Sequence, residues 1–487
     1  MRKGLAVGII LLFIGTSIIP TLAQKIKKSS LPTSKGHWSY VGGNGPGNYT
    51  RIQDAIDNSS DRDTIFVFNG TYNENIVIDK AIKLLGDNKN NTIIDGSSGN
   101  ESIIIIKANE VYIGGFTVRN SSPFYRGIFF RPNCNGVSII DNIIKNSRGA
   151  ILLQSSHNTN ISRNIIIDNY NNCDIDLINS SDNTICRNVV IHTSGVYPVS
   201  ISLSANSCNN KIIGNTINKS FYGISVAFSS NYNKIYANSI RNCEWYGIDL
   251  YGASYNDVNS NSISDNKWGV FVVWHSDHNN INSNTISNNI YGIRTEETSN
   301  STNNTFYHNN LFNNTINAYV NDGSINNWDN GYPSGGNYWD DYPGMDSFWG
   351  ENQDINGSDG VGDFSMQIPG GQNQDRYPLI EPYGMTRLSF IPHGGLGISG
   401  NIKNVGNTTA FRICWEVTFN GGFVLLGRDT LRLIPKPLVP GEEFTVKSKT
   451  ILGFGKVTLT MMLWADNAPV IVVKHNGTLL FFFLFIK

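Results

Sequence analysis

Charge is scarce in this sequence. Lysine and arginine number 37, aspartate and glutamate number 38, and charged residues make up only 15% of the 487 residues. The formal net charge of −1 excludes a dedicated nucleic-acid-binding protein, because such proteins neutralise phosphates with an excess of basic side chains. Lysine and glutamate, the usual residues of surface helices, are few, which disfavours a helical fold.

Long apolar runs and clustered cysteines are also missing. Beyond the first 25 residues no apolar stretch reaches the roughly 20 residues that cross a bilayer, so we expect no transmembrane helix in the mature chain. The six cysteines are spread from Cys134 to Cys414 without any CxxC spacing. This spacing indicates neither a zinc site nor a dense disulfide framework.

The first residues have the pattern of a secretory signal peptide. Arg2 and Lys3 precede an apolar run from Leu5 to Ile19, and Thr21-Leu22-Ala23 offers small residues for cleavage. We therefore predict a signal peptide over residues 1–23 and a linker over residues 24–48. The alternative is an uncleaved N-terminal membrane anchor, and in both cases the body of the protein is secreted or held at the cell surface.

What the sequence has in abundance is asparagine, 66 residues in all, and much of it is periodic. One set recurs every 22 to 27 residues, and a period near 24 is typical of a solenoid. Its members are Asn142, Asn164, Asn188, Asn215, Asn238, Asn261, Asn284 and Asn309.

Each repeat has the same internal order. An aliphatic residue stands two positions after each of these asparagines, an apolar residue stands three before, and in most repeats a second asparagine stands five before. A glycine and an alternating pair follow, as in Gly247-Ile248-x-Leu250. Short period-2 segments separated by asparagine or glycine predict three strands and three turns per coil. The fold class is therefore all-β, a single-stranded parallel β-helix of ~24-residue coils over residues 49–325.

Asparagine should have two uses in the turns of this helix. Its short side chain tolerates a left-handed backbone, and its amide can hydrogen-bond to the amide one coil away. We therefore expect ladders of asparagine side chains along the rod.

Both ends of such a helix need caps, because open strand edges promote aggregation. Residues 49–57 predict a short capping helix whose buried face is Ile52, Ala55 and Ile56. Residues 326–384 lose the repeat and are rich in aromatic residues, glycine and aspartate, which predicts a C-terminal cap. Residues 385–487 alternate strand-like segments with turn signals and predict a small β-sandwich.

Several segments together resemble a known family. They are Ile52 to Ile56, Asp63-Thr64-Ile65, Gly70-Thr71-Tyr72, Asn75, Ile82 to Gly86, the asparagine repeats, Gly336 to Trp339 and Asp375 to Leu379. Over residues 38 to 383 the chain resembles the NosD-like right-handed parallel β-helix family of pectin-lyase-like fold. The resemblance implies a right-handed helix, and the labels of that family are carbohydrate binding, sugar hydrolysis or periplasmic copper binding. Residues 403–410 and 440–442 are similar to Ig-like, CARDB-type adhesion modules.

Asp174 and Asp176 are the candidate catalytic residues. Both should point outward from one strand about 6.5 to 7 Å apart, a separation that suits paired carboxyls in glycoside cleavage. The outward neighbours that we expect on adjacent coils, Gly149, Ile151, Ser200 and Ser202, include no Lys, Arg or His. This favours solvated carboxylates over a catalytic pair.

Two metal sites are suggested by residue spacing. Oxygen ligands occupy positions of a calcium-binding loop in the cap, with glycine at position 6, at Asn352, Asp354, Asn356, Ser358 and Asp363. The alternative is a plain Asn/Asp/Gly turn. His275 and His278 could bind copper or zinc with Asp277, but a strong site needs three or four ligands at known spacing, so copper is disfavoured.

An aromatic residue stands before the repeat glycine in four successive coils, at Tyr222, Tyr246, Trp268 and Tyr291. Such a column is a candidate carbohydrate-binding platform or a stabilising ladder of like residues. We predict a secreted or cell-surface protein that binds carbohydrate or adheres to envelope proteins without catalysis. The alternatives are a polysaccharide lyase, hydrolase or epimerase and a copper-associated accessory protein.

Overall fold

The structure of the protein is a computed structural model. It describes residues 36–170, 173–193, 198–296, 301–321, 324–384, 388–405, 410, 413–439, 441–465 and 468–486. The predicted signal peptide lies outside these residues. The described residues are almost entirely β-structure, and no helix among them is long and apolar enough to span a membrane.

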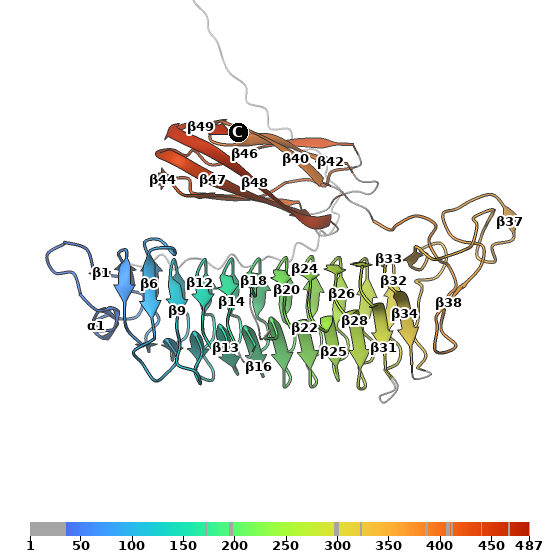
Figure 1. Ribbon diagram of the computed structural model, residues 1–487, viewed down its shortest axis with the longest axis horizontal. Coiled ribbons are helices and arrows are strands. Elements are labelled where there is room, and N and C mark those ends of the chain that lie inside the picture. Colours follow the sequence, from blue (N-terminus) through green and yellow to red (C-terminus); the bar gives the residue numbers. More distant parts are fainter. Residues whose placement is uncertain are drawn as a thin grey trace, which may run out of the picture. The chain divides into compact units, whose positions relative to one another are not determined.

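Three parallel sheets run along a solenoid, and successive coils add one strand to each (Figure 1). Sheet A contains β1 (Trp38–Val41), β2 (Thr64–Val67), β5 (Lys83–Gly86), β8 (Tyr112–Gly114), β11 (Ser138–Ile140), β14 (Asn160–Ser162), β17 (Thr184–Cys186), β20 (Lys211–Ile213), β23 (Lys234–Tyr236), β26 (Asp257–Asn259), β29 (Asn280–Asn282) and β32 (Thr305–Tyr307). Sheet B contains β3 (Gly70–Tyr72), β6 (Thr92–Asp95), β9 (Thr117–Arg119), β12 (Ile143–Lys145), β15 (Ile165–Ile167), β18 (Val189–Ile191), β21 (Thr216–Asn218), β24 (Ser239–Arg241), β27 (Ser262–Ser264), β30 (Thr285–Ser287), β33 (Asn310–Phe312) and β35 (Tyr338–Trp339).

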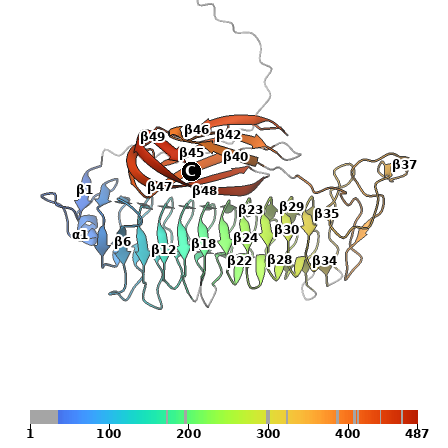
Figure 2. The same cartoon turned by 45° about the horizontal axis from the view of Figure 1, so that its top comes forward.

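Sheet C carries the candidate sites discussed below. It contains β4 (Ile76–Ile78), β7 (Ile104–Ile106), β10 (Ile128–Phe130), β13 (Ile151–Gln154), β16 (Ile175–Ile178), β19 (Ile201–Ser204), β22 (Tyr222–Ala227), β25 (Tyr246–Tyr251), β28 (Trp268–Val273), β31 (Tyr291–Thr295) and β34 (Ile316–Val320). Figure 2 shows strands of sheets B and C as two separate rows. The predicted parallel solenoid of ~24-residue coils is confirmed.

The inward positions of all three sheets form one continuous core. The aliphatic column two residues after the periodic asparagines, which includes Ile144, Ile217 and Ile263, is fully buried. The repeat glycines belong to the same packing, because a Cβ on Gly247 would lie 2.6 Å from the carbonyl oxygen of Gly269 and 2.5 Å from Ile263. Only glycine lets the coils approach this closely.

The asparagine ladders are present inside the turns. In the middle of the rod, Asn238 donates its side-chain N–H to Asn261 Oδ1 at 3.0 Å and accepts at its own Oδ1 from the side chain of Asn215 at 3.0 Å. The second column is bonded in the same way, as between Asn256 and Asn279 at 3.1 Å. The expectation of side-chain bonds between coils is confirmed.

The other expected use of asparagine is wrong for the ladder residues. The left-handed backbone lies at the residue before each of them, for example Arg187, Ala237 and Ser260, and this position accepts many residue types. The ladder asparagines themselves turn inward and bond to the next coil. Asparagine is therefore selected here for its buried amide, which both donates and accepts.

The N-terminal cap is the predicted one. Helix α1 (Ile52–Asp57) buries Ile52, Ala55 and Ile56. The backbone N–H groups of Ile52 and Gln53 donate to the Glu74 carboxylate at 2.8 and 3.1 Å, which satisfies donors at the helix start. The solenoid begins earlier than predicted, because β1 lies within the stretch expected to be a linker.

The C-terminal cap keeps more of the repeat than its composition indicated. Asn326 and Asn337 extend the two ladders by accepting from Asn304 and Asn309. Asp375 ends one ladder, since its Oδ2 accepts from the backbone N–H of Asn337 at 2.7 Å. The remaining strands form two short hairpins, β36 (Phe348–Trp349) with β37 (Ile355–Asn356), and β38 (Met366–Gln367) with β39 (Gln374–Asp375).

The C-terminal module consists of two antiparallel sheets whose residues share one core. One sheet contains β40 (Leu388–His393), β42 (Ser399–Asn404) and β46 (Glu443–Lys447); the other contains β41 (Gly395–Leu396), β43 (Cys414–Asn420), β44 (Phe423–Leu426), β45 (Asp429–Leu433), β47 (Leu452–Ala465), β48 (Ala468–Phe481) and β49 (Phe483–Ile486). Phe390 of the first sheet packs on Trp415 of the second. The predicted C-terminal β-module is confirmed as an antiparallel one, and its Ig-like character stays a prediction from the sequence.

Candidate functional site

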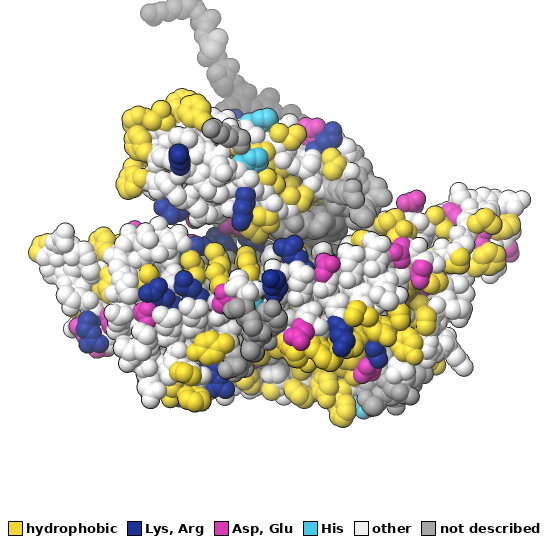
Figure 3. Space-filling model, viewed as in Figure 1, with side chains coloured by type: hydrophobic (Ala, Val, Ile, Leu, Met, Phe, Trp, Pro, Cys, Tyr) yellow, Lys and Arg dark blue, Asp and Glu magenta, His cyan; other side chains and the backbone are white. Residues whose placement is uncertain are grey.

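The predicted aromatic column is assembled on the outer face of sheet C. Tyr222, Tyr246, Trp268 and Tyr291 occupy the same register position in β22, β25, β28 and β31. Neighbouring ring centroids in this column are 4.6, 5.1 and 6.4 Å apart. Figure 3 shows the corresponding belt of hydrophobic side chains across the rod.

This column is packed on itself more than it is open to solvent. Trp268 is only 7% exposed, because Phe271 packs beside it and Lys267 lies over its ring at 4.4 Å. Arg294 covers the next ring, Tyr291, at 4.6 Å. The column is therefore part of a hydrophobic cluster on the outer face of sheet C, and the cationic side chains of Lys267 and Arg294 cover it.

Asp249 lies in this cluster. It lies at the same register position as Ser202, Ser225 and Phe271 on the neighbouring strands of sheet C, and its Oδ2 accepts from the hydroxyl of Ser225 at 3.1 Å. Burial among aromatic rings raises the pKa of Asp249 to about 7. The sequence gives no sign of this burial, because Asp249 stands at an outward position of its strand.

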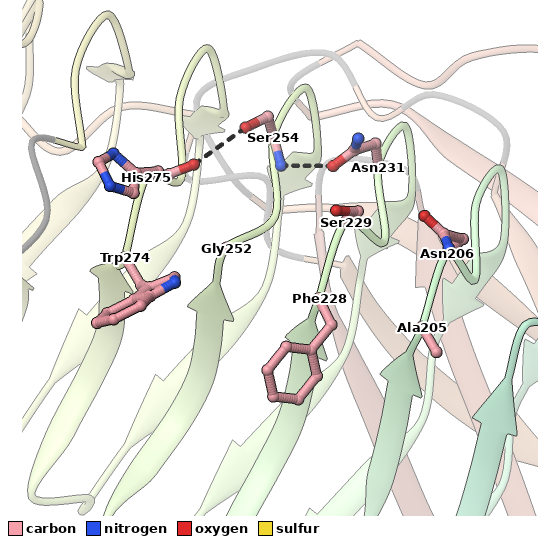
Figure 4. A pocket seen from close by; sticks show the side chains of 9 residues that line it. All are labelled: Ala205, Asn206, Phe228, Ser229, Asn231, Gly252, Ser254, Trp274 and His275. Carbon is pink, nitrogen blue, oxygen red and sulfur yellow. Dashed lines mark hydrogen bonds between the residues drawn. The ribbon is translucent and has the colours of Figure 1, made fainter.

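A more open site lies at the corner where the strands of sheet C end. Phe228, Gly252 and Trp274 follow β22, β25 and β28 at matching positions, and all three have left-handed backbone. The rings of Phe228 and Trp274 project outward and are 62% and 50% exposed (Figure 4). Gly252 has no side chain between them, which leaves a hollow of about 470 Å³, the corner pocket.

The wall of the corner pocket is built by aromatic contacts. The Tyr251 ring lies 5.5 Å from that of Phe228 and stacks on Trp274 at 5.6 Å with an interplanar angle of 7°. On the other side of the same turn a second exposed ladder stacks Tyr232, Tyr255 and His278, with centroid distances of 5.2 and 4.9 Å. Flat rings are thus displayed at regular intervals over three coils.

Amides and hydroxyls line the rest of the corner pocket. Asn231 Oδ1 accepts from the backbone N–H of Ser254 at 2.7 Å, and the Ser254 hydroxyl donates to the carbonyl of His275 at 3.4 Å. Asn206 and Ser229 also line the pocket, and its lining contains no Lys, Arg, Asp or Glu. The corner can therefore stack on a flat apolar face and hydrogen-bond to neutral polar groups at its edge.

The two candidate catalytic aspartates are not solvated. Asp174 is fully buried, and its carboxylate contacts His192 Nε2 at 2.9 Å and accepts from Asn169 Nδ2 at 3.0 Å. Asp176 is paired with Arg126 Nη2 at 3.1 Å. Burial raises the pKa of both carboxyls, while these partners act in the opposite direction.

The neighbours expected on the earlier coil were wrong, whereas Ser202 on the following coil lies beside Asp176 as predicted. Asp176 lies between Leu152 and Ser202, so the register on the earlier coil is one residue later than predicted. The basic partner, Arg126, comes from two coils before, and His192 comes from a turn of the following coil. Reading only the nearest outward positions could not reveal either residue.

The cap residues with calcium-loop spacing do not wind into one loop. Ile355 and Asn356 are extended in a hairpin with β36. The Asp363 carboxylate accepts from the backbone N–H groups of Ser347 and Phe348 at 3.0 Å each. Asn352, Asp354, Asn356 and Ser358 are exposed. Calcium binding stays a prediction from the sequence.

His275 and His278 stand at left-handed turn positions. The Asp277 carboxylate is bonded to the Thr302 backbone N–H at 2.7 Å. Within the described parts of the chain, no three His, Cys, Asp or Glu side chains are grouped to hold a metal ion. The two histidines contribute instead to the corner, where His275 lines the pocket and His278 stacks on Tyr255.

Sequence reasoning missed the corner aromatics. The aromatic column before the repeat glycine could be recognised in the sequence, because every member stands directly before that glycine. Phe228 and Trp274 lie at the ends of the same strands, but Gly252 occupies the equivalent position in the coil between them. The signal that could have found them is an aromatic residue just after the alternating apolar pair, at Phe228, Tyr251 and Trp274.

Comparison with known proteins identifies a family. A family model described as periplasmic copper-binding protein (NosD) matches residues 56–244 and 237–344. A cell surface glycoprotein of Methanothermus fervidus is 38% identical over 101 residues, which are 20% of this chain and only 16% of that glycoprotein.

Two solved structures are similar at low identity. The A-module of mannuronan C-5 epimerase AlgE4 from Azotobacter vinelandii has 16% identity and a TM-score of 0.44, covering 59% of this chain and 96% of that module. The tailspike protein of E. coli bacteriophage HK620, in complex with a pentasaccharide, has 11% identity and a TM-score of 0.45, covering 91% and 92%.

Proposed function

We propose that this chain, which belongs to the NosD family, is a secreted or cell-surface β-helix protein that binds a neutral glycan at the corner pocket without cleaving it. The observation that carries the proposal is the pair of exposed aromatic ladders with amides and hydroxyls between them. The similarity to a cell surface glycoprotein supports the location outside the cytoplasm.

The chemistry of the corner fits a sugar ring. A pyranose presents an apolar C–H face, which packs on a flat aromatic ring, and a rim of hydroxyls, which bond to amides and hydroxyls. Trp274 and Phe228 supply exposed rings, and Asn206, Asn231 and Ser254 supply polar groups. Coils repeat at about 4.8 Å, so successive weak contacts can act on one extended ligand.

The charge of the corner selects among glycans. Its lining carries no Lys or Arg to pair with a uronate carboxylate. A neutral glycan should therefore bind in preference to a polyuronate, since a carboxylate placed here would lose hydration without gaining a partner.

Removal of the exposed rings provides the test. We expect Trp274→Ala and Phe228→Ala each to weaken glycan binding about tenfold, because each removes a stacking surface, and calorimetric titration measures the change. Phe124→Ala is the matched control, since Phe124 is 75% exposed and lies outside the corner. Equal affinity of wild type and both corner variants would refute the assignment of the site.

Proton-transfer chemistry at Asp249 is a second candidate function, and one observation favours it. A carboxyl whose pKa is about 7 can donate and accept protons near neutral pH. Asp249 is nevertheless buried beneath aromatic side chains, so it lacks the open approach that the corner pocket has. Release of reducing or unsaturated ends that is lost in Asp249→Asn would support this candidate over the first.

A further inference from the structure

The end of the C-terminal module where β44, β47, β48 and β49 meet carries an unusual density of exposed apolar side chains. Phe481 is 55% exposed, and the surrounding residues are exposed to a similar degree. We call this surface the apolar tip; its exposed members are Leu396, Phe423, Leu425, Leu426, Phe454, Leu480, Phe481, Phe482, Phe483 and Phe485. Figure 3 shows the hydrophobic side chains gathered at this end of the module.

Strand register makes the apolar tip one continuous surface. Phe454 pairs with both Phe423 and Leu480 across β47, and Phe483 pairs with both Leu480 and Leu396. The rings of Phe454 and Phe481 lie 4.6 Å apart. The buried core of the module is formed by other residues, so the exposed side chains of the apolar tip are not needed for core packing. A contiguous exposed apolar patch of this kind marks an interaction surface.

Basic residues border the apolar tip and acidic residues avoid it. Lys456 lies in β47, Arg428 follows β44 and Lys449 precedes β47, and none of them forms an ion pair with another described residue. Residues 421–428, 450–465 and 474–487 contain no Asp or Glu. Residues 385–487 carry eleven Lys and Arg against five Asp and Glu, whereas the whole chain has a net charge of −1.

We propose that the apolar tip inserts into the interfacial layer of an anionic lipid membrane. Phe and Leu side chains enter the boundary between headgroups and acyl chains, and the bordering cations pair with lipid phosphates. The same positive charge opposes the alternative occupant, a second copy of the tip, because two such surfaces would repel. The module would then hold the rod at a membrane surface by contact of its strand ends.

Vesicle co-sedimentation of the purified protein tests this proposal. We expect binding to phosphatidylcholine vesicles that contain phosphatidylglycerol, with weaker binding as salt rises. The variant Phe423→Ser with Phe483→Ser should bind at least about tenfold more weakly, because two inserted rings are lost. Ile391→Ser is the matched control, because Ile391 is equally exposed on β40, away from the tip. Thermal unfolding of each variant checks that the module still folds.

Charge reversal supplies a second measurement. Lys449→Glu with Lys456→Glu should lower binding to the anionic vesicles and leave unfolding unchanged. Absence of vesicle binding by the wild-type protein, or equal binding by the double serine variant, would overturn the proposal. Analytical sedimentation could instead show a dimer that the same serine substitutions dissociate, without lipid binding. That result would assign the apolar tip to contact with a second copy and would also overturn the membrane proposal.

Discussion

Replacing Asn238 by alanine should destabilise the rod by about 3 kcal/mol or more. Its side chain has four buried hydrogen-bond contacts and one partly buried one: Oδ1 accepts from the backbone and side-chain N–H groups of Asn215, and the two N–H groups of Nδ2 are shared among Ile212 O, Asn261 Oδ1 and the partly buried Tyr236 O. Alanine replaces none of them, so the Asn215 backbone N–H loses its partner inside the protein. Urea unfolding followed by circular dichroism measures the loss.

Asn259→Ala is the matched control for the ladder. Asn259 lies in β26 of the same region, is half-buried on the outer side, and bonds to Asp257 at 2.9 Å. We expect a change within about 0.5 kcal/mol, as for other surface positions. If the two variants unfolded at the same urea concentration, the ladder would not be a main source of stability.

Asp249→Asn should remove part of the pH dependence of stability. The folded protein holds the pKa of Asp249 at about 7, well above the ordinary value of 3.8. Between about pH 4 and pH 7 the folded state therefore keeps a proton that the unfolded state releases, and the free energy of unfolding falls as pH rises. The full shift corresponds to about 4 kcal/mol lost by about pH 8, with little further loss above it.

Asparagine imitates the protonated carboxyl and can still accept from the Ser225 hydroxyl. The variant should match the wild type at pH 4 and exceed it by several kcal/mol at pH 8, measured as urea unfolding free energies at a series of pH values. Burial also raises the pKa of Asp375 to about 7, so the difference between the two proteins, rather than the wild-type slope, isolates Asp249. Parallel pH profiles of wild type and variant would show that Asp249 ionises normally.

The architecture was predictable because a solenoid repeats its physical constraints in every coil. The aliphatic column at Ile144 and Ile166 and the register of Tyr222 with Tyr246 follow from the period of the repeat alone. Asparagine at a fixed spacing, such as Asn215 and Asn238, is enough to indicate the ladder. Each of these features is decided within one coil and copied to the next.

The candidate sites were less predictable, because they depend on departures from the repeat. Arg126 reaches Asp176 across two coils, and His192 enters the core from a turn, so the carboxylates are buried rather than solvated. The corner pocket exists because Gly252 interrupts a column of aromatic residues. One glycine in one coil creates such a site, and a pattern defined by what all coils share does not indicate it.

The two aromatic columns also differ in solvent exposure, and the sequence alone does not reveal this difference. Trp268 and Trp274 are six residues apart on one coil, yet Lys267 and Phe271 cover the first ring while the second stands at an open left-handed turn. The exposed column, and not the one with the more regular spacing, is therefore the carbohydrate platform that we propose. The stacked and covered column stabilises the outer face of sheet C.

The central claim is that the rod binds a neutral glycan at its corner without cleaving it. The most direct test incubates the purified wild-type protein with a panel of neutral and uronate polysaccharides and measures bound ligand together with released reducing and unsaturated ends. The account predicts binding to at least one neutral glycan, weaker binding to polyuronates and no released ends. Product formation, or binding restricted to polyuronates, would contradict it.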